Sequence, residues 1–250
     1  MSNTTDVVKV KVRNMTKRFG DLLVLDDVSF DVKQGEFLCI VGPTGCGKTT
    51  FLNCITKLYT PTSGEILVDD EPVDLKKNSI AYIFQEYSTM PWLTVEQNVA
   101  FGLKLKHIDN KTIKERVNAM LSIVGLLEYK NAYPGELSTS MLQRVVIARA
   151  FATKPELLLM DEPYGQLDVE LRFKLEDEVI KLWKETGTTV IFITHNIEEA
   201  VYLSEKIMVL TNKPTSVKEI IDNNLERPRN VADPQFVELR NRITELIKWW

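Results

Sequence analysis

The sequence predicts an α/β fold: a mostly parallel sheet with flanking helices, together with an antiparallel β lobe and an inserted helical subdomain. Apolar, strand-like segments that pass into helical patterns recur at residues 37–41, 157–160 and 188–194, as they do in parallel sheets. Residues 8–13 instead alternate valine with lysine or arginine, which is typical of a half-exposed strand. Residues 88–152 have helical spacing, which indicates the insertion.

Size and composition agree with one globular unit. The chain has 250 residues, of which 44% are hydrophobic and 26% charged, enough for one large α/β domain or a core with an inserted lobe. The net charge of −4 gives no reason to expect nucleic-acid binding, which normally needs a basic face. No apolar run approaches the roughly 18 residues of a membrane span, and residues 1–6 lack a signal-peptide core. We therefore expect a cytoplasmic protein whose membrane role comes through a partner.

The cysteines and the first aromatic residue each allow a simple interpretation. Cys39, Cys46 and Cys54 are odd in number and lack paired metal-ligand spacing, which indicates reduced thiols. Cys39 and Cys54 fit small core positions, whereas Cys46 falls in a loop. Phe19 stands at a turn before strand-like residues 22–32; spacing alone favours a core position over an exposed stacking platform.

A glycine-rich loop lies between the apolar strand at residues 37–41 and a helix that starts near Phe51. Its nine residues are Gly42, Pro43, Thr44, Gly45, Cys46, Gly47, Lys48, Thr49 and Thr50. This is the context that a phosphate-binding P-loop requires, because glycines let backbone N–H groups surround an anion at a helix N-terminus. Lys48 is placed to reach β- and γ-phosphates, and Thr49 to bring its hydroxyl to Mg²⁺. The loop predicts a nucleoside triphosphate site.

The segments after the loop complete the core and form the insertion. Strands are expected at residues 65–68 and 80–84, and Gln85 ends the second at the edge where open α/β sheets bind ligands. Helices are expected at residues 94–105, 112–127 and 138–150. The middle helix has one apolar stripe, formed by Val117, Leu121, Val124 and Leu127.

Polar side chains stand at the ends of two later strands. Asp161 and Glu162 follow residues 157–160; beside a P-loop, Asp161 is a candidate for the Mg²⁺ shell and Glu162 for polarising the attacking water. The alternative is a helix start, for which Asp-Glu-Pro is a good sequence. His195 ends the strand at 188–194, expected at the same edge, which favours a functional histidine. His107, in a polar helical stretch, keeps a structural interpretation.

The C-terminal part is expected to hold a helix at residues 168–185, strands at 206–210 and 216–221, and a last helix that begins at Asp233-Pro234. We expect the apolar stripe of the last helix to dock on the core. It consists of Phe236, Leu239, Ile243, Leu246, Ile247 and Trp250.

Together these motifs resemble the ATPase subunit of ABC transporters over nearly the whole chain. By this resemblance Gln85 is the Q-loop glutamine, residues 157–162 are Walker B, Asp168 lies in the D-loop, and His195 is the switch histidine. Phe19 takes the place of the aromatic that stacks on adenine. The resemblance implies ATP and Mg²⁺ as ligands, with Gln85 near the metal beside Thr49 and Asp161.

The same resemblance implies a P-loop NTPase core and one ABC ATPase domain over residues 1–250. The RecA-like core with its antiparallel β lobe would comprise residues 1–87 and 153–225. Residues 88–152 would form the helical subdomain, and residues 226–250 the C-terminal amphipathic helix.

Residues 90–99 and 225–229, with the last helix, are similar to subunits that energise importers of nitrate, sulfonate, taurine or bicarbonate. Those subunits dock on a separate permease that works with an extracytoplasmic binding protein. The resemblance thus implies a peripheral protein at the cytoplasmic face of the cell membrane, serving import of a small anion such as nitrate, a sulfonate or taurine. Residues 85–105 would be the permease-docking surface.

One motif departs from the family pattern. The family signature is Leu-Ser-Gly-Gly-Gln or -Met, whereas residues 137–141 read Leu-Ser-Thr-Ser-Met. In the family this helix start approaches the γ-phosphate held by the opposite subunit, which makes Ser138 and Ser140 candidates for nucleotide contact. Thr139 and Ser140 replace glycines that allow close backbone approach. The effect is either steric or partly offset by a new hydroxyl donor; the helix should survive, since these residues cap well.

This departure keeps an alternative open: an ATP-binding but weakly active or regulatory subunit that works in a heterodimer rather than a homodimer. A soluble ABC-type ATPase of DNA repair or translation is a third class. Those proteins usually carry long coiled-coil insertions or two ATPase units, and the sequence has neither.

Overall fold

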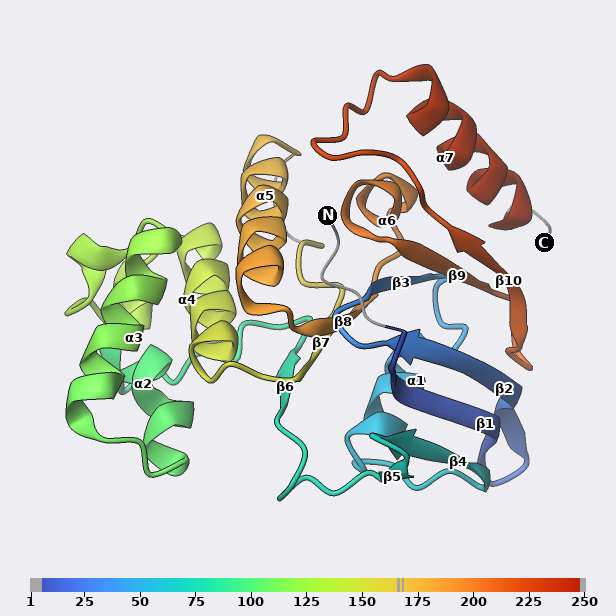
Figure 1. The fold of residues 1–250 in the computed structure, drawn as a ribbon, viewed down its shortest axis with the longest axis horizontal. Coiled ribbons are helices and arrows are strands. Elements are labelled where there is room, and N and C mark those ends of the chain that lie inside the picture. The colour runs from blue at the N-terminus through green and yellow to red at the C-terminus, as the bar shows by residue number, and fades with distance from the viewer. Residues whose placement is uncertain (1–5, 166, 168, 248–250) are drawn as a thin grey trace.

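The computed structural model describes residues 6–165, 167 and 169–247. The larger sheet in this part of the chain has six strands in the spatial order β10-β9-β3-β8-β7-β6 (Figure 1). In that order they are Val217–Asp222, Lys206–Leu210, Phe37–Val41, Thr189–Ile193, Leu157–Asp161 and Ile80–Ile83. Strands β9, β3, β8, β7 and β6 are parallel, and β10 is antiparallel to β9. Carboxyl ends of parallel strands share one edge, so the residues that follow β3, β6, β7 and β8 gather there.

The smaller sheet is antiparallel, in the order β2-β1-β4-β5. Its strands are Leu22–Lys33, Val8–Phe19, Ser63–Val68 and Glu71–Pro72. Valines 10 and 12 of β1 are fully buried, as the alternation in this segment predicts.

Helix α1 (Lys48–Ile55) packs between the two sheets, and its side chains Phe51, Leu52 and Ile55 share a core with both. Leu38 and Ile40 of β3 face this core, whereas Cys39 and Val41 face the opposite one. Because successive side chains of a strand point to opposite faces, an uninterrupted apolar run places β3 between two packed layers. The P-loop therefore begins at the end of a strand that is packed on both faces, which holds the start of the loop in place.

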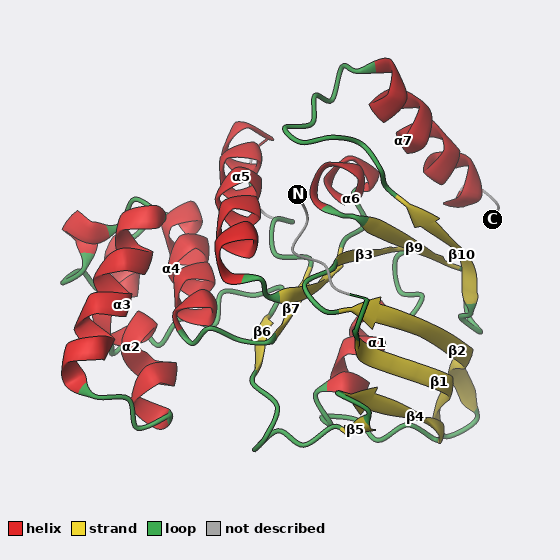
Figure 2. Cartoon of the chain, viewed as in Figure 1, coloured by secondary structure: helices red, strands yellow, loops and turns green. Residues whose placement is uncertain are grey.

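The opposite face of the larger sheet is covered by α5 (Val169–Thr186), α6 (Ile197–Leu203) and α7 (Pro234–Ile247) (Figure 2). Phe236 and Ile243 of α7 are buried, with 1% and 0% of their surface exposed. The expected docking of the last helix on the core is confirmed for the described residues; Trp250 lies outside them.

The helical insertion has its own apolar core. It consists of α2 (Val95–Leu105), α3 (Asn110–Ile123) and α4 (Thr139–Ala152), with 3₁₀ turns at Leu127–Tyr129 and Pro134–Glu136. These helices form the green to yellow-green lobe in Figure 1.

The helix expected at residues 112–127 ends earlier, at Ile123. Gly125 follows with a φ of +66°, a left-handed conformation that stops a helix. The phase of the stripe is lost there, so Leu126 is buried and Leu127 is 41% exposed. The assignment of Leu127 to the apolar stripe is therefore wrong.

No helix within the described ranges is both long and apolar enough to cross a bilayer.

Candidate nucleotide site

The P-loop connects the end of β3 to the N-terminus of α1, as predicted. Gly45 and Gly47 have φ values of +74° and +117°, and a Cβ on Gly47 would lie 2.8 Å from Cγ1 of Val24. Both the backbone conformation at position 47 and the lack of room for a Cβ therefore require glycine there. The hydroxyl of Thr215 donates to the carbonyl oxygen of Cys46, which fastens the loop to the segment before β10. The result is a fixed turn at a helix N-terminus, suited to an anion.

Lys48 brings a positive charge between this loop and the acidic strand end. Its side chain is only 5% exposed, and Nζ donates to the carbonyl oxygens of Gly42 at 2.9 Å and Pro43 at 3.0 Å. The same nitrogen lies 4.0 Å from Oε1 of Glu162. Lys48 is therefore held where phosphate oxygens over the loop would meet it.

Asp161 ends β7 and is 4% exposed. Burial raises the pKa of its carboxyl, and hydrogen bonds from the hydroxyls of Thr49 and Tyr82 act in the opposite direction. The Tyr82 hydroxyl donates to Oδ2 at 3.3 Å. Asp161 and Thr49 are 112 positions apart in the sequence, yet their side chains form a hydrogen bond.

The donors at this point fit Mg²⁺. Carboxylate and hydroxyl oxygens are the ligands this ion prefers, and it commonly takes one or two carboxylates and completes its shell with water and substrate phosphates. Among the described residues no group of three or more His, Cys, Asp or Glu side chains could hold a metal alone. One carboxylate and one hydroxyl from the protein suit an ion that takes water and substrate phosphates as its other ligands.

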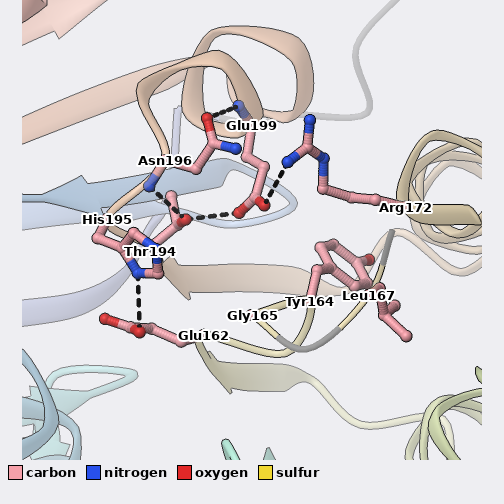
Figure 3. A pocket seen from close by; sticks show the side chains of 9 residues that line it. All are labelled: Glu162, Tyr164, Gly165, Leu167, Arg172, Thr194, His195, Asn196 and Glu199. Atoms are coloured by element: carbon pink, nitrogen blue, oxygen red, sulfur yellow. Dashed lines mark hydrogen bonds and ion pairs between the residues drawn. The ribbon is translucent and has the colours of Figure 1, made fainter. Parts of the chain in front are cut away.

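Glu162 and His195 face each other at the same edge (Figure 3). Oε2 of Glu162 lies 2.9 Å from Nδ1 of His195, and the two side chains are 19% and 56% exposed. Glu162 has a φ of +44°, which is uncommon for a residue with a side chain and typical of strained positions at functional sites. Its N–H donates to the carbonyl oxygen of Ile193 at 2.9 Å. No helix starts at Asp161-Glu162-Pro163; the next described helix begins at Val169, which rules out the helix-start alternative.

The remaining predicted residues lie farther from this cluster. Phe19 ends β1 and is 41% exposed, with Tyr59 edge-on at 5.2 Å and the Lys17 ammonium 4.7 Å from its ring centre. The core position that spacing alone favours is therefore wrong, because the residue is exposed at the strand end. Gln85 follows β6 and is exposed.

The signature segment starts α4 in the helical insertion. Ser138 caps the helix, its hydroxyl accepting the N–H of Met141 at 3.4 Å. The prediction that the helix survives without the two glycines is confirmed. Thr139 is exposed, whereas Ser140 is buried. Asp168 lies outside the described residues.

Several polar residues near the site were not predicted. Nothing in the sequence around Tyr82 distinguishes it from other aromatic residues in strands. Thr194, Glu199 and Arg172 line a small cavity of about 80 Å³ behind Glu162 and His195 (Figure 3). The one available signal was position: Thr194 directly precedes His195, and Glu199 lies in the first turn of the helix that follows.

Known proteins resemble this chain along almost its whole length. An uncharacterized ABC transporter ATP-binding protein from Methanocaldococcus jannaschii is 43% identical over 245 residues, which cover 96% of this chain and 92% of that protein. An aliphatic sulfonates import ATP-binding protein from Bacillus thuringiensis subsp. konkukian is 40% identical over 230 residues, covering 92% of this chain and 90% of that protein.

Solved structures agree with these relatives. A dimeric ATP-binding cassette in a post-hydrolysis state, bound to ADP and Pi, has a TM-score of 0.76 and 32% identity, and covers 87% of this chain and 100% of its own. A protein from Clostridium perfringens that is part of an ABC transporter complex has a TM-score of 0.79 and 25% identity, over 96% of this chain and 98% of its own.

These likenesses confirm the predicted fold class. Residues 25–165 match the profile of the ABC transporter family. With a strand-anchored P-loop and the acidic strand end beside it, the chain belongs to the ATP-binding subunits of that family and is an ATPase.

Proposed function

We propose that this ATPase energises a membrane importer for a small anion, with a sulfonate as the first candidate and nitrate or taurine as others. The observation that carries the proposal is the 40% identity, over 92% of the chain, to a protein named for aliphatic sulfonate import. The chain would then act at the cytoplasmic face of the cell membrane as a peripheral subunit.

The site supports the following roles in ATP hydrolysis. Backbone N–H groups of Gly42 and residues 44–50 and the ammonium of Lys48 bind the phosphates, and the exposed ring of Phe19 stacks on adenine. Thr49 and Asp161, with Gln85, would hold Mg²⁺, which when bound neutralises charge on the phosphates.

Glu162 then orients the attacking water and accepts its proton. His195 holds the Glu162 carboxylate by the contact at 2.9 Å and also reaches toward the γ-phosphate. The ammonium of Lys48 lies 4.0 Å from the other carboxylate oxygen of Glu162, so the residue that would bind phosphate also faces the one that would orient the water.

A second ATPase subunit would complete the site, as a homodimer or a heterodimer. This part of the proposal is supported by the dimeric form of the cassette bound to ADP and Pi. Ser138 at the exposed start of α4, with the backbone N–H of Ser140 and with Asp168, would contact the nucleotide held by the other subunit. Since the Ser140 side chain is buried here, Thr139 is the added side chain that would meet the partner.

The surface over residues 85–105 would dock on the permease. It exposes apolar side chains: Trp92 is 73% exposed, Leu105 65% and Phe101 37%. Single exposed apolar residues are ordinary, but Phe101 and Leu105 stand four positions apart on α2 and so share one face, which supports a protein contact. An extracytoplasmic binding protein would deliver the anion from the other side.

The test is transport by a reconstituted complex. The chain, its genetically neighbouring permease and the binding protein are assembled in vesicles, and uptake of labelled alkanesulfonates, taurine and nitrate is measured with ATP. We expect uptake of one of these anions, and none when the ATPase carries Glu162→Gln. An ATPase stimulated by its permease and binding protein without uptake of any of the three would overturn the substrate class.

A further inference from the structure

A buried hydrogen-bond network lies directly behind the contact between Glu162 and His195 (Figure 3). The Thr194 hydroxyl accepts the N–H of Asn196 at 2.9 Å and lies 2.5 Å from Oε2 of Glu199. Thr194 and Glu199 are 2% and 6% exposed. The network thus joins the residues on both sides of His195 to a carboxylate that the solvent barely reaches.

The roles of donor and acceptor in this network follow from its chemistry. A backbone N–H can only donate, so the Thr194 oxygen accepts from Asn196. The one proton of the hydroxyl is then directed at Oε2 of Glu199. Asn196 is fixed as well, because its Oδ1 accepts the N–H of Glu198 at 2.9 Å and that of Glu199 at 3.4 Å. The turn that carries His195 is held at both ends.

Arg172 of α5 supplies the counter-charge to Glu199 and Glu198, which lie 3.7 Å and 3.6 Å from its guanidinium. The guanidinium also lies 3.5 Å from Glu176, whose pKa burial raises to about 8. Because the Arg172 side chain is only 13% exposed, these charges act through a poorly screened interior. The pair of Arg172 and Glu199 thus joins α5 to α6 behind the site.

By contrast, the ring of His195 is 56% exposed, and its Nδ1 contacts Oε2 of Glu162. The orientation of the ring toward Glu162 must therefore come largely from the backbone on which it stands. A displacement of this turn by an ångström would suffice to lose most of the contact.

We propose that Thr194 and Glu199 are positioning residues for ATP hydrolysis: Glu199, held against Arg172, fixes the Thr194 hydroxyl, and this hydroxyl fixes the turn that presents His195 to Glu162. The inference rests on the proposed roles of Glu162 and His195 in hydrolysis.

The test uses the full-length protein with substitutions at Thr194, Thr188 and Glu199. Thr194→Val removes the hydroxyl at nearly constant size, and Thr194→Ser restores it. Thr188→Val is the matched control: Thr188 precedes the opposite end of β8, is also 2% exposed, and donates to the carbonyl oxygen of Pro155 at 2.9 Å. Glu199→Gln, of the same size as the native residue, is the second variant should Thr194→Val fail to fold.

The ring signals of histidine provide a direct readout. The chain has two histidines, so NMR resolves His195 with exposed His107 as an internal reference, and His195→Ala assigns the pair. Thr194→Val and Glu199→Gln should shift the His195 ring signal and leave that of His107 in place. The kcat for ATP should fall about ten-fold with KM within about two-fold, because geometry and not ATP binding is altered. Thr194→Ser should restore both readouts.

The Thr188→Val control distinguishes a positioning role of Thr194 from a general loss of fold stability. Thr188→Val should lower Tm about as much as Thr194→Val while leaving the His195 signal and kcat unchanged. If His195→Ala is inactive but Thr194→Val keeps the native His195 signal and kcat, the positioning role is overturned and the proposed function stands. If His195→Ala hydrolyses ATP at the native rate, the proposed role of His195 itself is overturned.

Discussion

Nδ1 of His195 lies 2.9 Å from Oε2 of Glu162, although the two residues are 33 positions apart in the sequence. The contact follows from strand register. Strands β7 and β8 are parallel neighbours, and Asp161 pairs with Ile193 at their ends. The residues just beyond each end must then emerge side by side at the carboxyl edge of the sheet. The proposed base and the histidine proposed to hold it are thus brought together by two buried apolar strands.

The first prediction concerns Glu162. Glu162→Gln keeps the side chain's size but cannot accept a proton, so kcat for ATP should fall at least about 100-fold. ATP binding should persist or tighten slightly, since the phosphates no longer compete with a carboxylate 4.0 Å from Lys48. Steady-state hydrolysis and equilibrium nucleotide binding measure the two effects. The exposed acid Glu170 on α5 serves as control in Glu170→Gln. Hydrolysis near the native rate in Glu162→Gln would contradict the assignment.

Much of this site could be predicted from sequence, since its residues stand at the ends of uninterrupted apolar runs. Asp161 and His195 each end such a run, and parallel strands leave their ends at a common edge. The sequence pattern is less informative about side chains that contact the site from within a strand or helix. Tyr82 on β6 contacts Asp161 because β6 neighbours β7, a pairing that no local pattern encodes.

The position of Phe19 shows a second limit. An aromatic at a strand end is usually packed, and here only the family resemblance indicated an exposed ring. The cause is topological: β1 ends at the rim of the antiparallel sheet, where Tyr59 covers one side of the ring and leaves 41% of the residue exposed. The error at Leu127 is of another kind, since one left-handed glycine shifted the phase of an otherwise sound helical pattern.

A second prediction follows for adenine binding. Phe19→Ala should weaken ATP binding by about ten-fold, because base stacking on an aromatic ring contributes about 1–3 kcal/mol. Phe19→Trp should preserve binding. Leu22→Ala is a matched control, since Leu22 pairs with Phe19 across the turn and is 54% exposed. Calorimetry with ATP and with inorganic triphosphate distinguishes stacking from a phosphate effect, as only ATP should respond. Equal weakening by Leu22→Ala would point to a disturbed hairpin instead.

The third prediction concerns the signature segment. Thr139 is exposed at the start of α4 and Ser140 is buried, so only Thr139 should obstruct close approach of a second subunit. We expect Thr139→Gly to raise ATP turnover about three-fold at protein concentrations that favour dimers, since glycine permits closer backbone contact. Ser140→Gly should change turnover little.

The direction of the effect at Thr139 is decisive. Lower turnover in Thr139→Gly, at unchanged Tm, would mean that the threonine hydroxyl contributes a donor to the phosphate. Negligible turnover in both the native chain and Thr139→Gly would instead favour a regulatory subunit that needs a different partner. Turnover is measured against protein concentration, so that a dimer-dependent change is separated from an intrinsic one.

The last prediction concerns Glu176, which is fully buried on α5. Among the described residues its carboxylate oxygens have no hydrogen-bond partner. Burial, with the charge of nearby Glu199, raises the pKa of Glu176 from 4.5 to about 8, and Arg172 only partly offsets this. The native state therefore binds this proton more tightly than the unfolded chain does. The stability that the proton contributes is complete below about pH 4.5 and is lost as the pH rises through about 8.

Glu176→Gln replaces the acid with a neutral side chain of similar shape, so its effect on the free energy of unfolding should depend on pH. At pH about 9 the variant should be more stable than the native protein by on the order of 2 kcal/mol, because it avoids a buried charge. At pH about 5, where Glu176 is protonated, the difference should be small. Urea unfolding at both pH values measures this, with Glu170→Gln as the exposed control on the same helix. An equal difference at both pH values would mean that the pKa of Glu176 is not raised in the native state.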